Sequence, residues 1–369
     1  ILGMDDSHRT ASHIAAQVIP AALAVAETCG TSGADLLAAI VAAYELAVPV
    51  GHALRRTTRE RGQDLKGVVG VLAATVAAGR CAGLDAEQLA LALGLAVDMA
   101  SGTEQYVYDK DGCDTKDLIA GFAARNAVFA TRLVQAGFRG PLSGLDGEYG
   151  FFRAYGEGYA SDMFDDLGRD FAILTTGFKP HGGCRHTHQA VDAVQQILRS
   201  GPVDTTDIER VVIGTYRYAT EPSFRAAADP ATRELAGLSI RVAGAVSLVR
   251  HSAWPDDYAA WDAPEVRRLR HITDVVVDPE IDRTFPQKNG CRVTLQFKDG
   301  SVREGYVEYA KGEPEFPISE GELQEKFAAL TREILPASTA AEIYDRCMAL
   351  DKLPNVRSLL ALAKTPGLV

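Results

Sequence analysis

The chain is poor in paired cysteines, in aromatic residues and in positive charge. Its six cysteines are scattered without the spacing of a disulfide framework, which favours reduced thiols and a cytoplasmic location. Lysine and arginine number 38 against 49 acidic residues, and the net charge of -11 disfavours nucleic acid or an anionic membrane as partner. Glycine, proline or charge interrupts every apolar run, so we expect no membrane-spanning segment.

Nucleotide-binding motifs are also missing from the sequence. It has neither a P-loop nor a Gly-x-Gly-x-x-Gly pattern after a strand, so we expect no nucleotide cofactor. The 369 residues, 47% apolar and 24% charged, are typical of a globular protein of about two domains. The opening residues lack an initiator methionine and begin on a polar cluster, and we therefore expect further chain before Ile1.

The hydrophobic pattern changes along the chain and indicates two kinds of domain. Alanine-rich helical patterns cover 15–28, 33–55, 66–82, 86–101 and 116–136. Strand patterns then cover 171–175, 210–215, 274–277, 292–297 and 301–309, with helical patterns at 187–199 and 239–251. Helical patterns return at 320–334, 338–348 and 355–363. We predict a mainly α protein with a large helical domain, residues 1–170 and 317–369, and a smaller α+β domain, residues 171–316.

The densest polar cluster is the stretch Phe178–His188, with sequence FKPHGGCRHTH. It holds two fixed cations, three imidazoles and a thiol, and its glycines and proline predict a shaped turn. Such turns commonly present catalytic groups, although a basic surface loop is the alternative. A zinc site at Cys184, His186 and His188 is disfavoured because single-residue spacing differs from that of usual ligand pairs. A nucleophilic Cys184 beside His186 stays open as a further alternative.

Asp5-Asp6-Ser7-His8, followed by His13, forms a second polar cluster just before an apolar helical pattern. One interpretation is that these residues begin the helix and carry solvated charge. The other is an acid–base site, because an imidazole beside carboxylates exchanges its proton near neutral pH. The spacing of five between the two histidines does not bring them to one helical face as three or four would.

Lys116 lies at the start of a predicted helix, where positive charge is unfavourable against the helix dipole. The neighbouring Asp114 and Asp117 give a structural explanation for it. The functional explanation is an anionic ligand, because a lysine beside another cation can act as a base or anchor a carboxylate. We predict that Lys116 and Lys179 face one cleft, although 63 residues separate them.

These stretches together resemble the MmgE/PrpD family, which includes 2-methylcitrate dehydratase, cis-aconitate decarboxylase and iminodisuccinate epimerase. The matching stretches are Asp5–His13 with Val18–Ala24, Thr115-Lys116 with Ala123–Asn126, Lys179–His188, and Gly312–Pro314 with Pro317–Phe327. The resemblance covers essentially the whole chain and implies that about 80–100 family residues precede Ile1.

The resemblance implies a homodimer with a helical domain and an α+β lid, acting on small polycarboxylates without metal or cofactor. It implies site lysines at Lys116 and Lys179, a site histidine at His13 and a site hydroxyl at Ser7. Asp64 and Cys184 stand where the decarboxylase branch has histidines, which disfavours decarboxylation. The candidate catalytic residues are Lys116, Lys179, His13, His8 and Asp6. The candidate substrate-binding residues are Ser7, Asp64, Cys184, Arg185, His186 and His188.

The expected function is that of a cofactor-independent lyase that dehydrates a hydroxy-polycarboxylate. Removal of a proton next to a carboxylate builds a dianion, and cations at that carboxylate stabilise it. Lys116, Lys179 and Arg185 are candidates for this role, and His8, His13 or His186 for the acid at the leaving hydroxyl. The alternatives are an epimerase of a substituted succinate, then a cis-aconitate decarboxylase, then a carboxylate-binding protein without activity.

Overall fold

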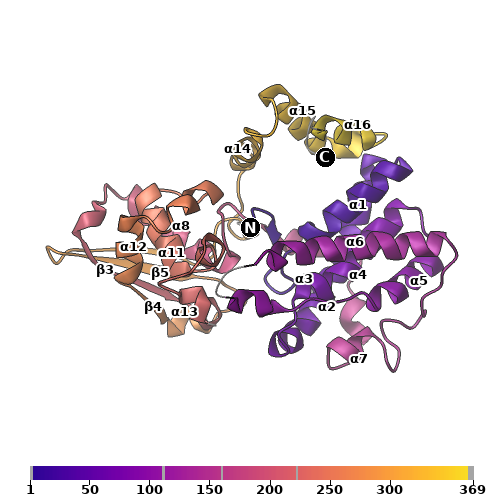
Figure 1. Cartoon of the computed structure of the whole chain (residues 1–369), viewed down its shortest axis with the longest axis horizontal. Helices are drawn as coiled ribbons and strands as arrows, with labels where there is room; N and C mark the ends of the chain where they lie inside the picture. The colour runs from indigo at the N-terminus through magenta and orange to yellow at the C-terminus, as the bar shows by residue number, and fades with distance from the viewer. Residues whose placement is uncertain (1–2, 110–112, 159–160, 222, 365–369) are drawn as a thin grey trace. The chain divides into compact units, whose positions relative to one another are not determined.

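The computed structural model describes residues 3–109, 113–158, 161–221 and 223–364, and the chain folds into two compact units (Figure 1). We call the larger one the helical unit and the smaller one the α+β unit. The helical unit comprises Asp6–Glu104, Asp117–Thr176 and Ser319–Val369. The α+β unit comprises Ile1–Asp5, Gln105–Lys116 and Gly177–Ile318. The predicted helical domain 1–170 is thus interrupted, and Lys116 belongs to the α+β unit, because the chain passes between the units more often than composition reveals.

The helical unit follows the predicted succession of helices. Its helices are α1 (Ala15–Cys29), α2 (Gly33–Glu60), α3 (Leu65–Val68), α4 (Gly70–Cys81), α5 (Ala86–Val97), α6 (Thr115–Gln135), α7 (Phe151–Tyr155), α14 (Glu320–Thr331), α15 (Ala337–Met348) and α16 (Arg357–Leu360). Short 3-10 turns η2 (Ser161–Phe164), η3 (Ala172–Thr175), η8 (Leu350–Lys352) and η9 (Ala361–Ala363) and the two-residue β1 (Asp6–Ser7) complete it, while η1 (Glu104–Tyr108) begins at its edge. The starts of the predicted helices 86–101 and 320–334 are confirmed, and Asp85 and Ser319 each cap their helix in a reciprocal capping box.

Small residues explain how the helices of this unit pack. All of α4 except Arg80 is buried, and it packs against α1 and α2. Ala73, Ala74, Ala77 and Ala78 are fully buried, so helix backbones approach closely without large side chains between them. The predicted helix 66–82 is divided at Val69 into α3 and α4.

Helix α2 bears on the expectation that no segment spans a membrane. By length and composition it is apolar enough to cross one, although its sequence includes Pro49 and Asp35. Several of its apolar residues, such as Leu36, Tyr44 and Leu54, are buried in the cores of the helical unit. Composition alone cannot separate a spanning helix from a core helix, and the packing of α2 against α4 is typical of a core helix.

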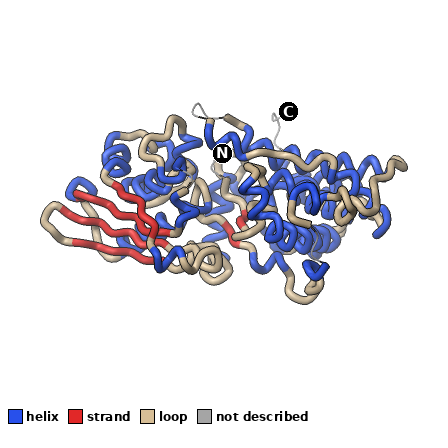
Figure 2. Tube along the Cα trace, turned by 90° about the horizontal axis from the view of Figure 1, so that it is seen from below, coloured by secondary structure: helices blue, strands red, loops and turns tan. Residues whose placement is uncertain are grey.

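The α+β unit is built on a four-stranded sheet. Its strands are β3 (Ile208–Thr215), β4 (Thr273–Val277), β5 (Cys291–Phe297) and β6 (Val302–Val307), in the order β4-β3-β5-β6 (Figure 2). Strands β3 and β4 are parallel, and the other two pairings are antiparallel. Strand β5 alternates buried and half-buried residues, as expected for a strand with one face on the core.

Helices cover one face of this sheet. The longer ones are α8 (His188–Arg199), α11 (Ile240–Arg250) and α12 (Pro264–His271), and the short ones are α9 (Arg217–Thr220), α10 (Arg233–Ala236) and α13 (Pro279–Asp282). The remaining elements are β2 (Gly177–Phe178) and the 3-10 turns η4 (Arg185–Thr187), η5 (Thr205–Asp207), η6 (Ser223–Ala226) and η7 (Pro255–Ala260). Sheet and helices share one core, in which residues such as Val194, Ile213, Val246 and Val293 are fully buried.

Two segments differ from the sequence prediction. The expected strand 171–175 is the 3-10 turn η3, because Glu45 accepts a hydrogen bond from the backbone N–H of Ala172 at 2.6 Å and so replaces a strand partner. Helix α12 was not predicted, because its sequence PEVRRLRH is mostly polar. Its Val266 and Leu269 are nevertheless buried and attach it to the core.

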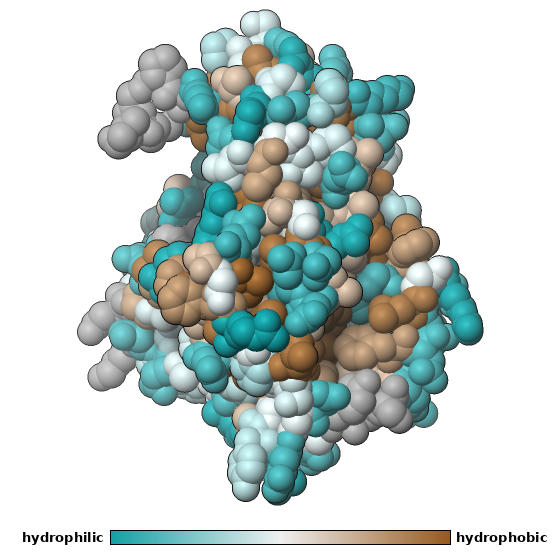
Figure 3. Space-filling view, turned by 90° about the vertical axis from the view of Figure 1, so that its right-hand side faces the viewer, coloured by the Kyte–Doolittle hydropathy of each residue, from teal (hydrophilic) through white to brown (hydrophobic). Residues whose placement is uncertain are grey.

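Apolar side chains also remain at the surface of the helical unit. Leu118, Phe122 and Phe129 lie on one face of α6 and are 50%, 44% and 55% exposed. Figure 3 shows apolar patches between hydrophilic side chains on one side of the molecule. A contiguous stripe of this kind is typical of a contact surface.

Candidate functional site

The polar stretch 178–188 is held as a turn against other loops of the α+β unit. The backbone N–H groups of Gly182 and Cys184 donate to the carbonyls of Ala253 and Gly237, each at 2.8 Å. Gly183 has a φ of +85°, and a Cβ there would lie 2.7 Å from the carbonyl oxygen of Gly237. Only glycine fits this close approach, which explains the glycine pair in the motif. The turn then continues into η4 and α8.

Lys179 is the most unusual charged residue of this turn. It is only 3% exposed, and its amino group donates to the carbonyl of Gly3 and lies 3.6 Å from the carboxylate of Asp5. Burial lowers the pKa of Lys179 to about 8, an effect that the Asp5 carboxylate partly offsets and the Lys116 charge reinforces. A lysine of this kind exchanges protons near neutral pH and can act as a base.

Lys116 lies close enough to Lys179 for its charge to act on it. Both residues belong to the α+β unit, and the like charge of Lys116 is among the causes of the lowered pKa of Lys179. Cys184 and Arg185 contribute to the same local field. Two ammonium groups in one field attract a dianion, so this arrangement supports the prediction of a shared carboxylate site.

Arg185 has a different role from the substrate contact that we predicted. Its guanidinium is buried and donates twice to the Glu313 carboxylate, from Nε at 3.0 Å and from Nη2 at 2.6 Å. Nη1 donates to the Lys311 carbonyl at 2.9 Å, and the Asn289 amide donates to the same Glu313 oxygen at 3.0 Å. A cation neutralised in this way holds the turn in place and has little capacity left for a ligand.

The prediction for His188 also needs correction, while the substrate contact of Cys184 stays a prediction. His188 is fully buried, and its Nδ1 accepts a hydrogen bond from Arg185 Nη1 at 3.1 Å, so we assign it to the supporting network. Cys184 is half-buried at the start of η4. Among the described residues, Cys184, His186 and His188 do not gather their ligand atoms as a metal would require.

Gly312 explains how Glu313 reaches Arg185. Its φ is +90°, and a Cβ there would lie 1.9 Å from the carbonyl oxygen of Phe178. That carbonyl belongs to the residue just before Lys179, and the Phe178 N–H donates to the Gly312 carbonyl at 2.8 Å. The Gly312-Glu313 pair therefore packs against Phe178 and stabilises the turn that contains Lys179.

In the helical unit, Asp6 organises the start of α1. Its carboxylate accepts hydrogen bonds from the Ala15 N–H at 3.0 Å and from the Tyr44 hydroxyl at 2.6 Å. Its backbone carbonyl lies 2.7 Å from His13 Nδ1. Because a carbonyl only accepts, Nδ1 of His13 carries a proton. Asp6 is thus a positioning residue, and the catalytic role of His13 stays a prediction. The neighbouring Ser7 is buried as well.

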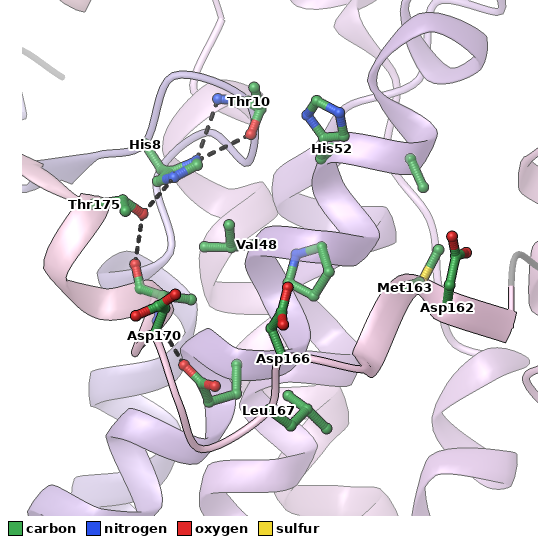
Figure 4. A pocket seen from close by; sticks show the side chains of 14 residues that line it. His8, Thr10, Val48, His52, Asp162, Met163, Asp166, Leu167, Asp170 and Thr175 are labelled. Atoms are coloured by element: carbon green, nitrogen blue, oxygen red, sulfur yellow. Dashed lines mark hydrogen bonds between the residues drawn. The ribbon is translucent and has the colours of Figure 1, made fainter.

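His8 holds a loop rather than offering a proton. The backbone N–H groups of Thr10 and Ala11 both donate to its Nδ1 at 3.2 Å, which fixes the proton of the neutral ring on Nε2. Nε2 then donates to the Thr175 hydroxyl at 2.9 Å, as Figure 4 shows. Both ring nitrogens are engaged, so the predicted catalytic role of His8 is replaced by a structural one.

The groove beside His8 does not suit a polycarboxylate. It is a cavity of about 590 Å³ within the helical unit, and Figure 4 shows Asp162, Asp166 and Asp170 along its wall. Glu45 is a further lining residue. Four carboxylates repel an anionic substrate, so the cavity is no candidate for the predicted chemistry.

Asp64 is likewise engaged in the fold. It begins α3 by accepting a hydrogen bond from the Lys66 N–H at 2.8 Å, and it pairs with the Lys66 amino group at 3.3 Å. Both side chains are buried. The predicted substrate contact of Asp64 therefore has no support in the helical unit.

Sequence reasoning missed Tyr216, which lies between strand β3 and α9 and contacts the motif. Tyr216 is fully buried, and its hydroxyl lies 2.7 Å from Nδ1 of His186. It also missed the pair of His181 and Asp192, whose Nε2 and Oδ1 atoms are 2.8 Å apart. No local pattern indicates either contact, because the partners come from different elements.

Comparison with known proteins gives the class of the chain. Residues 1–162 match the MmgE/PrpD N-terminal domain and residues 181–350 match the MmgE/PrpD C-terminal domain. The chain therefore belongs to the MmgE/PrpD family, as its motifs predicted. Lys116 lies in the first matched region, and Lys179 lies between the two.

Three known proteins are similar to nearly the whole chain. The cis-aconitate decarboxylase-like protein oryM of Aspergillus oryzae is 28% identical over 97% of this chain and 79% of its own length. The cis-aconitate decarboxylase of Aspergillus terreus is 26% identical over 98% of this chain and 78% of its own length. The human cis-aconitate decarboxylase is 25% identical over 99% of this chain and 77% of its own length.

Proposed function

We propose that the protein is a lyase that acts on a small polycarboxylate. The observation that carries this proposal is the lysine pair of the α+β unit, in which Lys179 is buried beside Asp5 and its pKa is lowered to about 8 by burial and by Lys116. A polycarboxylate presents at least two carboxylates, and one of them can pair with the ammonium group of Lys116. The similarity to cis-aconitate decarboxylases supports the same substrate class.

The reaction begins at the carbon next to a carboxylate. The neutral form of Lys179 takes the proton from that carbon, and the charge that develops on the carboxylate oxygens is stabilised by Lys116. Each such interaction is worth about 3 kcal/mol if it equals a donor of an oxyanion hole. In a hydroxy acid the adjacent C–O bond then breaks, its electron pair goes to the leaving oxygen, and protonation of that oxygen releases water.

Dehydration is the first candidate and decarboxylation the second. Asp64 is paired with Lys66, and Cys184 carries a thiol. Neither position therefore offers an imidazole that could protonate a carbanion after loss of carbon dioxide. The relatives favour decarboxylation, since two of the three are named cis-aconitate decarboxylase and the third is named cis-aconitate decarboxylase-like. Epimerisation of a substituted succinate needs the same first step and a second acid on the opposite face of the carbon.

Incubation in deuterated water separates these reactions. The protein is mixed with citrate, 2-methylcitrate, cis-aconitate or iminodisuccinate, and proton NMR follows exchange at the α carbon, loss of water and inversion. Carbon dioxide release is measured in parallel. Dehydration or exchange without carbon dioxide is expected, whereas steady carbon dioxide release from cis-aconitate establishes the second candidate. No change in any substrate contradicts both.

Two matched variants locate the chemistry. Lys179→Met is expected to abolish turnover. Lys288→Met is the control, because Lys288 lies on the surface of the same unit and is paired with Glu308. Equal activity of the two variants would exclude Lys179 as the base.

We also propose that the protein is a cytoplasmic homodimer. The family resemblance and the exposed apolar face of α6 support the second copy, and the scattered cysteines support the reducing compartment. Light scattering tests the proposed dimer, because a mass of one chain, about 39.5 kDa, contradicts it.

A further inference from the structure

The proposed dehydration builds negative charge on the leaving hydroxyl oxygen, and the structure of the α+β unit indicates which residue stabilises it. We infer that Tyr216 holds His186 as the tautomer with its proton on Nε2, so that His186 donates a hydrogen bond to the leaving oxygen. This inference rests on the proposed function for the identity of the reaction. The state of the ring itself follows from hydrogen bonds alone.

The orientation of Gln189 is the first step of the argument. Its amide Nε2 lies 2.8 Å from the backbone carbonyl oxygen of His186, and a carbonyl accepts only. The amide nitrogen must therefore face that carbonyl, because a turned amide would place two oxygens in contact. The same nitrogen lies 3.3 Å from the Tyr216 hydroxyl oxygen. Gln189 thus donates to Tyr216.

The direction of the next hydrogen bond follows from the first. The Tyr216 oxygen accepts from Gln189, so its own proton is directed to the remaining neighbour, His186 Nδ1 at 2.7 Å. Burial raises the pKa of the Tyr216 hydroxyl, with a smaller contribution from Cys184, so the hydroxyl keeps its proton at every working pH. Nδ1 of His186 is therefore an acceptor, and the proton of the neutral ring resides on Nε2.

Aromatic packing fixes the two rings in this relation. Phe285 stacks on the Tyr216 ring with centroids 4.2 Å apart and planes 9° from parallel. Tyr218 meets the His186 ring edge to face at 4.7 Å. Tyr216 is fully buried whereas His186 is only half-buried, so the pair reaches from the core to an accessible surface. Rings held in this way present a proton in one direction.

His186 belongs to the same polar stretch as Lys179. It lies two residues after Cys184, which acts electrostatically on both Lys179 and Tyr216. On these grounds we place the Nε2–H group of His186 at the substrate that Lys179 meets. In the dehydration, Lys179 takes the α proton, and the C–O bond breaks toward oxygen while Nε2–H of His186 donates a hydrogen bond to that oxygen. The ammonium group of Lys179 passes the proton to the oxygen, which leaves as water, and Lys179 is neutral again.

The tautomer is tested without any substrate. The protein labelled with ¹⁵N-histidine is examined by NMR, in which protonated and unprotonated ring nitrogens have distinct shifts. The resonances of His186 are assigned by their loss in His186→Gln. A protonated Nε2 with an unprotonated Nδ1 is expected in the wild type, and a mixture of tautomers in Tyr216→Phe. A protonated Nδ1 in the wild type, or an unchanged spectrum in Tyr216→Phe, overturns the inference.

Kinetics with a polycarboxylate that is turned over test the role in catalysis. His186→Gln is expected to lower kcat about 10²–10³-fold with KM nearly unchanged, the range of one lost oxyanion-hole donor. Tyr216→Phe is expected to lower kcat about tenfold, as for one net hydrogen bond. His271→Gln is the control, because His271 is exposed and paired with Asp229 in the same unit. Equal kcat for His186→Gln and His271→Gln overturns the inference. A correct tautomer without turnover of any polycarboxylate contradicts instead the proposed function.

Discussion

Replacement of Lys179 by methionine tests the central feature of the site, a buried amino group. Lys179 is 3% exposed, and burial together with Lys116 and Arg185 lowers its pKa to about 8, while Asp5 and Cys184 act in the opposite direction. Methionine has a similar length and no charge. The substitution therefore removes the cost of burying the ammonium group and keeps most of the packing.

The size and sign of the effect follow from proton linkage. The ordinary pKa of lysine is 10.5, so the difference of about 2.5 units from the value near 8 corresponds to about 3 kcal/mol. The cost is present in full below pH 8, where both the folded and the unfolded chain carry the proton. Between pH 8 and 10.5 the unfolded chain binds more protons, so stability rises with pH and the cost disappears. At pH 9.5 roughly half of it is left.

We therefore expect Lys179→Met to be more stable than the wild type at pH 7, by up to about 3 kcal/mol. The advantage should shrink by about 2 kcal/mol at pH 9.5. Urea unfolding followed by tryptophan fluorescence measures this, because both tryptophans, Trp254 and Trp261, lie in the α+β unit with Lys179. Lys288→Met is the control, since the hydrogen bond to Glu308 raises the pKa of Lys288 and no gain is expected. A difference between wild type and Lys179→Met that does not vary with pH would refute the reasoning.

Three further outcomes are expected. Glu313→Gln leaves the Arg185 charge buried without its partner and should destabilise the α+β unit by about 3–5 kcal/mol; unfolding midpoints equal to the wild type would contradict this. Gly312→Ala places a methyl group 1.9 Å from the Phe178 carbonyl oxygen and should yield little folded protein, whereas Gly300→Ala, with a positive φ but open space, should cost only about 1 kcal/mol. Activity should persist in a chelator, and elemental analysis that finds a stoichiometric metal needed for turnover would overturn the metal-free prediction.

The fold could be predicted where local sequence determines it. Asp85 and Ser319 begin helices through contacts three residues away, and the turn before Ser301 follows from a glycine of positive φ at Gly300. The prediction failed at 171–175, where an apolar run resembles a strand but a side chain from α2, Glu45, satisfies the backbone instead. Such a partner, 127 residues away, leaves no local trace.

The candidate site could likewise be predicted only in part from the sequence. Residue type and motif selected Lys116 and Lys179, whose charges act on one another within the α+β unit, and their role in catalysis stays a prediction. Residue type and motif were not enough for Arg185, which looks like an anion ligand in the sequence and pairs with Glu313, 128 residues later. Nor could they indicate the proton direction at His186, which depends on the tyrosine that follows strand β3. Charge and chemistry can be predicted from sequence, but the partner that neutralises a charge depends on tertiary packing.

The α+β unit is assembled from three separate segments, and this has a consequence for how the chain is made. Asp5 and Gly3 meet Lys179 only after more than 170 further residues have left the ribosome. At about 5–20 residues per second, that interval lasts on the order of ten seconds or longer. During this time α1, α2, α4 and α5, which pack against one another, can already associate. The order of synthesis thus favours a helical unit that is partly assembled before the lysine site closes, while its last segment, Ser319–Val369, is added afterwards.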